Sequence, residues 1–431
     1  MREMKDSGVE WIGEIPKEWN VGKTLYALSM PITDGPHETP ELFDEGIPFI
    51  SAEAVSCGNG HIDFEHIRGY ISQEFYEECC KKYVPKINDI YMIKSGATTG
   101  KVAKVETQKL FTIWSPLAVF RVEPQRCYYE YLYYFIQSDA YQKQIENKWT
   151  YGTQQNIGMR TLEKLMICFP SITQQKLIAD YLDSKCSKID EIIEKQLSII
   201  EKLKEYKLSI ITEAVTSGIN PDVEMKDSGS VWFGNIPINW EMKRLKYVFH
   251  IQKDIAGEEG HTVLSITQRG IIPKDFSNNE GQFANSYANY QLVHKGDFAM
   301  NHMDLLTGWV DISKYEGVTS PDYRVFVLND KNGMCPKYYL YMMQMCYSAR
   351  IFYGLGQGVS GMGRWRLQAD KFLNFYIPIP PYDEQKKIAD YITDKVNHIE
   401  VEIDKRNKLI KKYQEYKKSL IYEVVTGKKE V

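Results

Sequence analysis

The chain has 431 residues, which is too long for one ordinary hydrophobic core, so two or more domains are expected. Its composition, 43% hydrophobic and 26% charged, is that of a soluble globular protein, and no apolar run approaches the roughly 18 residues that span a bilayer. The net charge of −4 argues weakly against a nucleic-acid-binding role, although a local basic surface would be diluted in that total. The first six residues lack an apolar signal region and the cysteines form no CxxC pair, so a cytoplasmic protein with no membrane partner is expected.

Two segments of the chain occur twice. Met4–Trp19 returns as Met225–Trp240 with 10 of 16 positions identical. Gln174–Thr216 returns as Glu384–Thr426 with 20 of 43 positions identical. The stretches between these repeats look unrelated to each other. This arrangement indicates one duplicated frame that holds two diverged inserts.

Both inserts read as mixed α/β segments. In chain order, β-rich runs are predicted at 47–50, 90–93, 118–122, 263–266, 298–300 and 325–328. Aromatic-rich helices are predicted at Tyr128–Ile136 and Lys337–Cys346. Gly218 and Pro221 mark the linker between the two halves.

A long helix with coiled-coil spacing follows each insert. The apolar positions recur at steps of four and three residues over about five heptads without Gly or Pro, although a plain amphipathic surface helix would show a similar pattern. The positions predicted to form the helix-pairing seam are Ile178, Leu182, Ile189 and Leu203 in the first helix and Ile388, Ile392, Ile399 and Leu409 in the second. The same phase places Lys185 and Lys395 in the seam. Thr173 and Asp383 are predicted to cap the helix starts, and Gly218 and Gly427 to end the helices.

These features together resemble the specificity subunit of type I restriction–modification systems. The motifs that carry the resemblance are the half-opening formula "KDSGVEWIGEIPKEW", the helix entries "PPYDEQKKIADYI" and "FPSITQQKLIADYL", and the strand–turn segments "YVPKINDIYMIKSGATTGKVA" and "LVHKGDFAMNHMDLLTGWV". The resemblance covers essentially the whole chain. The first half departs from it at one point, because it lacks the double proline before its helix.

The resemblance implies an α+β fold: two α/β target recognition domains separated by two long antiparallel coiled-coil helices, related by a pseudo-twofold internal repeat. The domains implied are 1–172 and 218–382 for target recognition, and 173–217 and 383–428 for the conserved helices. Two modification (methyltransferase) subunits would dock on this chain, restriction subunits can add to the complex, and the assembly would act on double-stranded DNA. The chain itself would be a non-catalytic reader of a bipartite site, with S-adenosylmethionine, ATP and Mg held by partner subunits and no cofactor or metal bound by this chain.

Loops that bear hydrogen-bonding and basic side chains are the candidate DNA contacts, because bases are read by donors and acceptors and phosphates by cations. In the first insert these residues are Lys94, Ser95, Thr98, Thr99, Lys101, Tyr151, Gln154, Gln155 and Asn156. In the second insert they are Asn301, His302, Arg324, Gln357, Ser360, Arg364 and Arg366. For any single residue, an ordinary solvated loop is an equally good interpretation.

Two other functions were weighed against DNA reading. A self-contained DNA adenine methyltransferase is suggested by "FYGLGQGVSG" and "IPPY", but such enzymes need Asn, Asp or Ser where this chain has Ile379. A purely structural coiled-coil adaptor would show no salt-dependent DNA binding. "GATTGKV" is one residue short of a phosphate loop and has Val102 where Ser or Thr should ligate magnesium. No metal-ligand spacing or catalytic triad was found.

Overall fold

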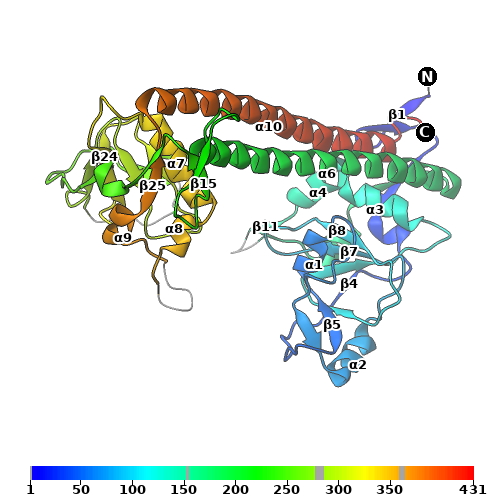
Figure 1. Ribbon diagram of the computed structural model, residues 1–431. Helices are drawn as coiled ribbons and strands as arrows, with labels where there is room; N and C mark the ends of the chain where they lie inside the picture. Colours follow the sequence, from blue (N-terminus) through cyan, green and yellow to red (C-terminus); the bar gives the residue numbers. More distant parts are fainter. Residues whose placement is uncertain (1, 152–154, 277–285, 359–364) are drawn as a thin grey trace. The chain divides into compact units, whose positions relative to one another are not determined.

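The computed structural model describes residues 2–151, 155–276, 286–358 and 365–431. The chain divides into two compact units, and each is formed by one insert together with parts of both long helices. The first unit contains Met1–Gln196 and Asn407–Val431, and the second contains Leu197–Arg406. Figure 1 shows the two long helices, α6 (Ile172–Ser217) and α10 (Tyr382–Val425), that contribute to both units.

The first unit is a mixed α/β structure. Its strands are β1 (Met4–Asp6), β2 (Glu14–Pro16), β3 (Asn20–Lys23), β4 (Thr33–Asp34), β5 (Ile47–Ile50), β6 (Gly69–Ile71), β7 (Ile90–Ile93), β8 (Val102–Lys104), β9 (Thr112–Ile113), β10 (Leu117–Phe120), β11 (Thr150–Tyr151), β12 (Gln155–Asn156) and β13 (Met166–Phe169). Its shorter helices are η1 (Thr24–Ala27), α1 (Ala52–Cys57), α2 (Gln73–Lys82), α3 (Tyr129–Gln137), α4 (Asp139–Glu146) and α5 (Met159–Glu163).

The second unit repeats this plan with different lengths. Its strands are β14 (Met225–Asp227), β15 (Asn235–Pro237), β16 (Glu241–Arg244), β17 (Phe249–Gln252), β18 (Leu264–Thr267), β19 (Gly270–Pro273), β20 (Gln291–Val293), β21 (Phe298–Met300), β22 (Val310–Ile312), β23 (Gly317–Thr319), β24 (Arg324–Leu328) and β25 (Tyr376–Ile379). Its shorter helices are η2 (Leu245–Tyr247), α7 (Pro336–Ser348), α8 (Ile351–Gly354) and α9 (Ala369–Asn374).

The inserts, which look unrelated in sequence, share one central sheet. The order is β4-β10-β7-β8 in the first unit and β17-β24-β21-β22 in the second. Before the strand β7, the backbone N–H of Lys86 donates to Asp89 at 2.8 Å, and before β21 that of His294 donates to Asp297 at 2.8 Å. The inserts look unrelated in sequence but have the same core, because the hydrogen bonds that fix strand order and this turn can be formed by many apolar sequences.

Outside the central sheet, the two units differ. In the first unit, β5 pairs with β6 and β9 and is flanked by α1 and α2, whereas the second unit has the two-stranded sheets β18-β19 and β20-β23. Most of these parts lie in sequence between β4 and β7 or between β17 and β21. The exceptions are β9, which precedes β10, and β23, which precedes β24. The central four-stranded sheet is the same in both units, whereas the strands and helices outside it differ.

The repeated opening motif packs against the end of a long helix in each unit. In the first unit Trp19 joins the core that contains Val424 of α10, and in the second Trp240 joins the core that contains Ala214 of α6. The hydroxyl of Tyr422 donates to the Ile12 carbonyl at 3.2 Å, so the two ends of the chain meet in the first unit (Figure 1).

The heads are joined to the helices by equivalent buried polar groups. The side chain of Gln175 accepts from the backbone N–H of Tyr128 at 2.8 Å and donates to the Pro170 carbonyl at 3.0 Å. Gln385 makes the same pair of bonds to Cys335 and Pro380, both at 2.9 Å. Each insert is thus fixed to the first turns of the helix that follows it.

The helix ends follow the predicted glycines but not the predicted caps. Gly218 and Gly427 have φ of +79° and +73°, the left-handed conformation that ends a helix at little cost for glycine. The start of α6 is capped two residues earlier than Thr173, since Ser171 and Gln174 exchange hydrogen bonds between side chain and backbone. Asp383 lies inside the first turn of α10, so it is not the N-cap residue. Its negative charge there interacts favourably with the helix dipole.

Candidate functional site

A short turn follows the central strand in each unit. In the first unit the turn joins β7 to β8, and the Thr99 hydroxyl donates to the Gly96 carbonyl at 2.7 Å. In the second the turn joins β21 to β22, and Asp304 accepts from the backbone N–H groups of Leu306 and Thr307, both at 3.0 Å. Both turns are therefore held by their own side chains, and their exposed atoms keep a fixed position.

A second segment, distant in sequence, lies against each turn. In the first unit the backbone N–H of Ile157 donates to the Lys94 carbonyl at 2.9 Å, and in the second that of Leu367 donates to the His302 carbonyl at 2.9 Å. Ser95 also forms an isolated bridge with Asn156. The two groups of candidate residues in each insert are therefore brought together into one site per unit.

Exposure differs among the candidates of the first unit. Lys101 and Asn156 are exposed, whereas Ser95, Thr98, Thr99 and Gln155 are half-buried. The ammonium group of Lys101 donates to the Ser56 carbonyl at 3.3 Å. The backbone of Tyr151 pairs with that of Gln155 in the hairpin β11-β12, and Gln154 lies outside the described residues.

Lys94 is held by an acid that was not predicted from sequence. Asp34 on β4 is 1% exposed, and its Oδ2 atom lies 3.3 Å from the Lys94 ammonium and 3.2 Å from the His37 imidazole. Its Oδ1 atom accepts from Lys82 at 2.5 Å. Asp34 is separated from Lys94 by 60 positions, and no local pattern connects them. A lone acid in a candidate DNA-reading insert gives no signal of its own.

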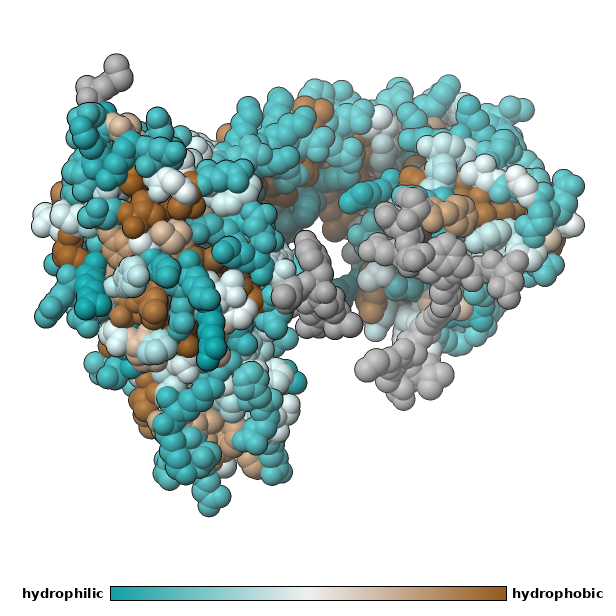
Figure 2. Space-filling view, turned by 180° about the vertical axis from the view of Figure 1, so that it is seen from behind, coloured by the Kyte–Doolittle hydropathy of each residue, from teal (hydrophilic) through white to brown (hydrophobic). Residues whose placement is uncertain are grey.

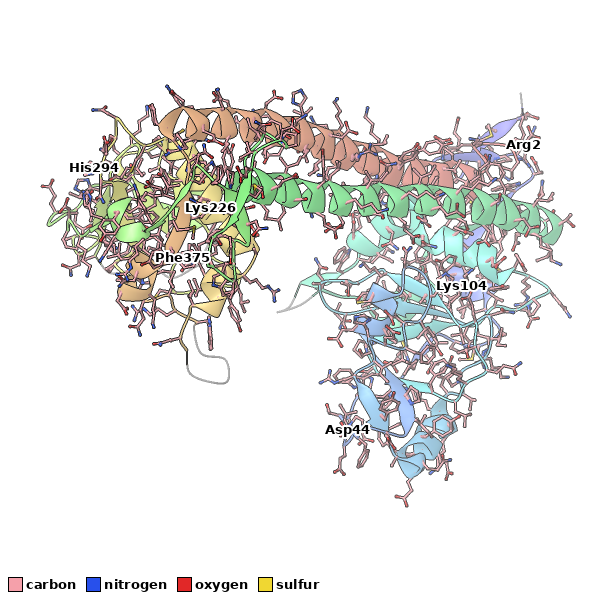
Figure 3. All side chains as sticks on the ribbon, viewed as in Figure 1. Arg2, Asp44, Lys104, Lys226, His294 and Phe375 are labelled. Carbon is pink, nitrogen blue, oxygen red and sulfur yellow. The ribbon has the colours of Figure 1, made fainter. Side chains whose placement is uncertain are left out.

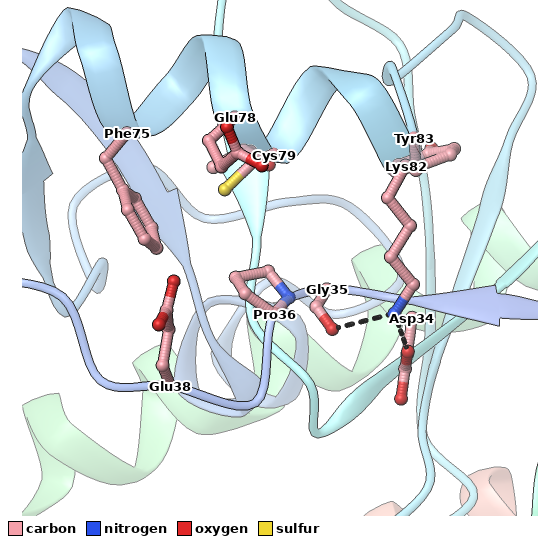
Figure 4. Close-up of a pocket in the computed structure, with 10 residues that line it drawn as sticks. Asp34, Gly35, Pro36, Glu38, Phe75, Glu78, Cys79, Lys82 and Tyr83 are labelled. Carbon is pink, nitrogen blue, oxygen red and sulfur yellow. Dashed lines mark hydrogen bonds and ion pairs between the residues drawn. The ribbon is translucent and has the colours of Figure 1, made fainter.

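The Asp34 cluster borders a pocket in the first unit. Figure 4 shows the Lys82 ammonium donating to both Asp34 and the Gly35 carbonyl, the latter at 3.2 Å. The pocket has a volume of about 220 Å³, and its lining also includes Glu38 and Glu78. Because the lining combines acidic side chains with a lysine that is already paired, it favours a structural role over nucleic-acid binding.

The candidates of the second unit include two buried bases. His302 is 9% exposed, and Arg324 is 5% exposed with its Nη2 donating to the Leu367 carbonyl at 2.8 Å. Gln357 and Arg366 are exposed and their backbones form a bridge. Because Arg324 is buried, it can contact a base edge only after a change of conformation. Its role in DNA binding stays a prediction.

Asn301 shapes the turn that it precedes. Its side-chain oxygen accepts from the backbone N–H of Met303 at 3.2 Å and that of Asp304 at 3.3 Å. The Tyr347 hydroxyl donates to its carbonyl. Ser360 and Arg364 lie outside the described residues.

Other buried ionisable groups in the first unit are structural. Asp89 accepts from Arg121 at 2.7 Å through both Nε and Nη2, and from the hydroxyl of Tyr83. On β8, Lys104 (labelled in Figure 3) is 7% exposed and lies 3.6 Å from Glu130. These pairs neutralise charge inside the sheet and leave no free group for chemistry.

Six of the eight positions predicted for the helix-pairing seam are buried, and their role in pairing stays a prediction. Ile178, Leu182, Ile189, Ile388, Ile392 and Ile399 are buried, and Leu203 is half-buried. The prediction for Leu409 is wrong, because it is 38% exposed while Ile410 is 8% exposed. Beyond the first turns, one of the two apolar positions of each heptad lies one residue later than the predicted phase, whereas the other agrees with it.

The cause is an extra four-residue step at the same place in each repeat. The buried positions run from Leu182 to Cys186 and from Ile392 to Val396, where the heptad phase expected Lys185 and Lys395. Two successive steps of four followed by one of three cover 11 residues once in each helix, after which the seven-residue spacing resumes. The lysines are exposed as a result.

An ion pair joins the two helices in each unit. Lys417 of α10 lies 2.6 Å from Asp190 of α6 in the first unit, and Lys207 of α6 lies 2.6 Å from Glu400 of α10 in the second. Moving toward higher numbers along α6 corresponds to lower numbers along α10, so the helices are antiparallel. Hydrophilic side chains cover most of the helix surface that is turned to the viewer in Figure 2.

The described residues offer little else for chemistry. Among them, no group of three or more His, Cys, Asp or Glu side chains could hold a metal ion. Within the same ranges, no helix combines the length and the apolar composition that crossing a bilayer requires.

Two α/β heads, each with a turn and a second segment that lies against it, and an antiparallel pair of long helices define the class of a duplicated recognition protein. The family model for the type I restriction modification DNA specificity domain matches residues 36–202 and 237–412. The chain belongs to this family. The predicted family, fold class and role as a type I DNA-specificity protein are thereby confirmed.

Relatives support the same assignment over nearly the whole length. The putative type I restriction enzyme MjaX specificity subunit of Methanocaldococcus jannaschii is 25% identical over 434 residues, 97% of this chain and 95% of that protein. The MjaVIII specificity subunit of the same organism is 24% identical over 389 residues, 85% of each chain. A solved chain from a study of complex assembly and conformational transition of the type I R-M system has a TM-score of 0.68 at 12% identity, covering 95% of this chain and 98% of that one.

Proposed function

We propose that this chain is the non-catalytic reader of a type I restriction–modification complex and binds one half of a bipartite DNA site with each unit. The observation that carries the proposal is that the two turn sites are equivalent. In each unit the same backbone hydrogen bond holds a second segment against the turn: Ile157 donates to Lys94 in the first unit, and Leu367 donates to His302 in the second. The same frame presents Lys94 and Asn156 in one unit and His302 and Arg366 in the other. Equivalent frames with different side chains suit the reading of two different sequences.

The antiparallel helices would carry the partners. Two copies of one helix motif, related by an approximate twofold axis, offer two similar surfaces, which suits docking of two identical modification subunits. In this proposal restriction subunits add to that assembly in the cytoplasm. S-adenosylmethionine, ATP and Mg are held by partner subunits. The recognition domains are residues 1–172 and 218–382, and the conserved helices are 173–217 and 383–428.

Local structure supports the non-catalytic assignment against a fused methyltransferase. Ile379 ends strand β25, where it pairs with Glu241, and the two following prolines lead directly into α10. The carbonyl of Pro380 accepts from the buried side chain of Gln385 at 2.9 Å. A segment tied to a helix start in this way lacks both the polar side chain and the open position needed to hold a flipped adenine.

A segment exchange tests bipartite reading. Residues 20–170 would be replaced by the corresponding segment of a family member with a different DNA site, and methylated adenines would be mapped in cells that also make the modification subunit. We expect one half-site to change and the other to stay. The matched control exchanges residues 241–380 and should change the other half-site. A change of both half-sites in either chimera would contradict the proposal.

Cofactor binding tests the non-catalytic assignment separately. Isothermal titration of the purified chain with S-adenosylmethionine should give no heat of binding, whereas the complex with the modification subunit should bind it. Saturable binding by the chain alone would favour the methyltransferase.

A further inference from the structure

The second unit contains three basic side chains that lack a neutralising acid. They are Arg324 at the start of β24, His302 in the turn after β21, and Arg366 in the segment that lies against this turn. Among the described residues, none of the three forms an ion pair with a carboxylate, whereas the buried Lys104 and the half-buried Lys94 and Arg121 each do.

The three residues meet around the backbone of Leu367. The guanidinium of Arg324 donates through Nη2 to the Leu367 carbonyl and stacks over Phe372, 5.0 Å from the ring centroid. The carbonyl of His302 accepts from the Leu367 N–H at 2.9 Å. Arg366, the residue before Leu367, is exposed. The cluster therefore runs from the interior of the unit to its surface. Arg366 is accessible as it stands, whereas an anion contacts the buried Arg324 and His302 only after a local change of conformation.

Two buried nitrogen atoms of this cluster have no hydrogen-bond partner among the described residues. They are Nη1 of Arg324 and Nδ1 of His302. Buried polar atoms are almost always paired, and a buried charge without a counter-charge is more costly still. Burial and the two arginines lower the pKa of His302 to about 3, and burial lowers the pKa of Arg324 to about 10. The cluster therefore has a positive electrostatic potential that no nearby carboxylate in the described part of the chain balances.

In the first unit, the equivalent positions include an acidic residue. Ala118 occupies the position of Arg324, because Ala118 pairs with Met92 on β7 as Arg324 pairs with Met300 on β21. Lys94 occupies the position of His302, because each lies two residues after that methionine. Asp34 pairs with Ala118 across the edge strand and binds Lys94. In the second unit the residue after Gln252, at the position of Asp34, is the exposed Lys253.

We propose that Arg324, His302 and Arg366 form a binding site for one phosphodiester group of the DNA backbone, a site that the first unit replaces with the internal pair of Asp34 and Lys94. The inference rests on the proposed function and adds the chemical group that is bound. A phosphate offers several acceptor oxygens and a full negative charge, which match two guanidinium groups and an imidazole. A guanine edge would occupy one arginine and leave the remaining positive charge uncompensated.

The salt dependence of DNA binding distinguishes a phosphate contact from base reading. The substitution Arg366→Gln removes the exposed charge, and Lys331→Gln is the matched control because it removes an exposed charge beyond the opposite end of β24. Affinity would be measured by fluorescence anisotropy on the complex of this chain with its modification subunit, using the mapped site and a scrambled duplex at several salt concentrations.

For Arg366→Gln we expect weaker binding of both duplexes by a similar factor, with the slope of log K against log salt reduced by about 0.9. Lys331→Gln should leave the slope unchanged. An unchanged slope for Arg366→Gln, or a loss confined to the mapped site, would overturn the phosphate assignment. Failure of the unsubstituted complex to prefer the mapped site would instead overturn the proposed function.

Inorganic phosphate provides a direct probe of the same site. In the full chain, the imidazole of His302 would be followed by proton–carbon NMR during a phosphate titration, with His302→Asn used to assign the signal. We expect the pKa of His302 to rise in phosphate because the anion favours its charged form, and Arg324→Lys to weaken this response. A His302 signal that does not respond to phosphate would overturn the site.

Discussion

The two recognition units place different chemistry on one frame. In the first, the buried carboxylate of Asp34 is shared by Lys94 and Lys82, so the base of the reading turn contains its own counter-charge. In the second, Arg324 and His302 occupy the equivalent region without an acid, and the charge is left for a ligand. The difference teaches that one sheet order can support either a self-contained or a ligand-dependent site. Strand pairing fixes where side chains lie, and residue type decides what they bind.

The largest expected effect tests whether the repeated opening motif does the same work in both units. Trp19 and Trp240 are 1% and 0% exposed, and each packs against the end of a long helix. Replacing either with Ala should destabilise its own unit by about 3–5 kcal/mol, through lost burial and the cavity left behind. Hydrogen exchange read separately for the two units measures this. A loss of protection in the wrong unit would break the equivalence.

A smaller effect tests the corrected phase of the helix seam. Ile200 and Ile410 are equivalent positions of the repeat and are 5% and 8% exposed. Each Ile→Ala substitution should destabilise by about 3 kcal/mol, in the second and first unit respectively. Leu409→Ala is the matched control, and as a surface substitution it should change stability by less than about 0.5 kcal/mol. If thermal unfolding showed that Leu409→Ala destabilises the protein as much as Ile410→Ala, the originally predicted heptad positions would be favoured instead.

The glutamines that join each head to its helix should show a similar effect in both units. Gln175→Leu or Gln385→Leu leaves a buried backbone N–H and a carbonyl without partners, and should cost about 2 kcal/mol. The exposed Gln414→Leu serves as control. Urea unfolding with segment-specific exchange measures both. Unequal costs would show that one head is held by other contacts.

Acidification should separate the two units. The pKa of His302 is lowered in the folded state to about 3, so folding requires the neutral imidazole. Stability from this group is present above the ordinary value near 6.5 and is lost as pH falls below it, by about 1.4 kcal/mol per pH unit down to about pH 3. His302→Asn should remove that slope from the second unit. Equal acid sensitivity in both units would contradict the assignment, because the first has Lys94 at this position.

The sequence was informative where the physics is local or periodic. The helix spans, the terminal Gly218 and Gly427, and most of the seam followed from apolar spacing and glycine conformation. The misplaced Leu409 shows the limit of this approach. A seam with an 11-residue step and one with strict heptads differ by a single residue, and both phases contain apolar side chains.

The candidate sites were predictable only as separate loops. The turn and the hairpin of each unit were recognised by their polar and glycine-rich composition. No local pattern marks Asp34 or the burial of Arg324, because burial and pairing depend on strands that lie far apart along the chain.

By itself the amino-acid sequence determined the duplication, the two long helices and the family, since these are written in repeated letters and in periodic apolar residues. Only the tertiary structure decided that the diverged inserts share a central sheet, and that one of them neutralises its reading turn while the other does not. The physical reason is that hydrogen-bonded strand order tolerates many sequences, whereas the balance of buried charge is set by residues that meet only after folding.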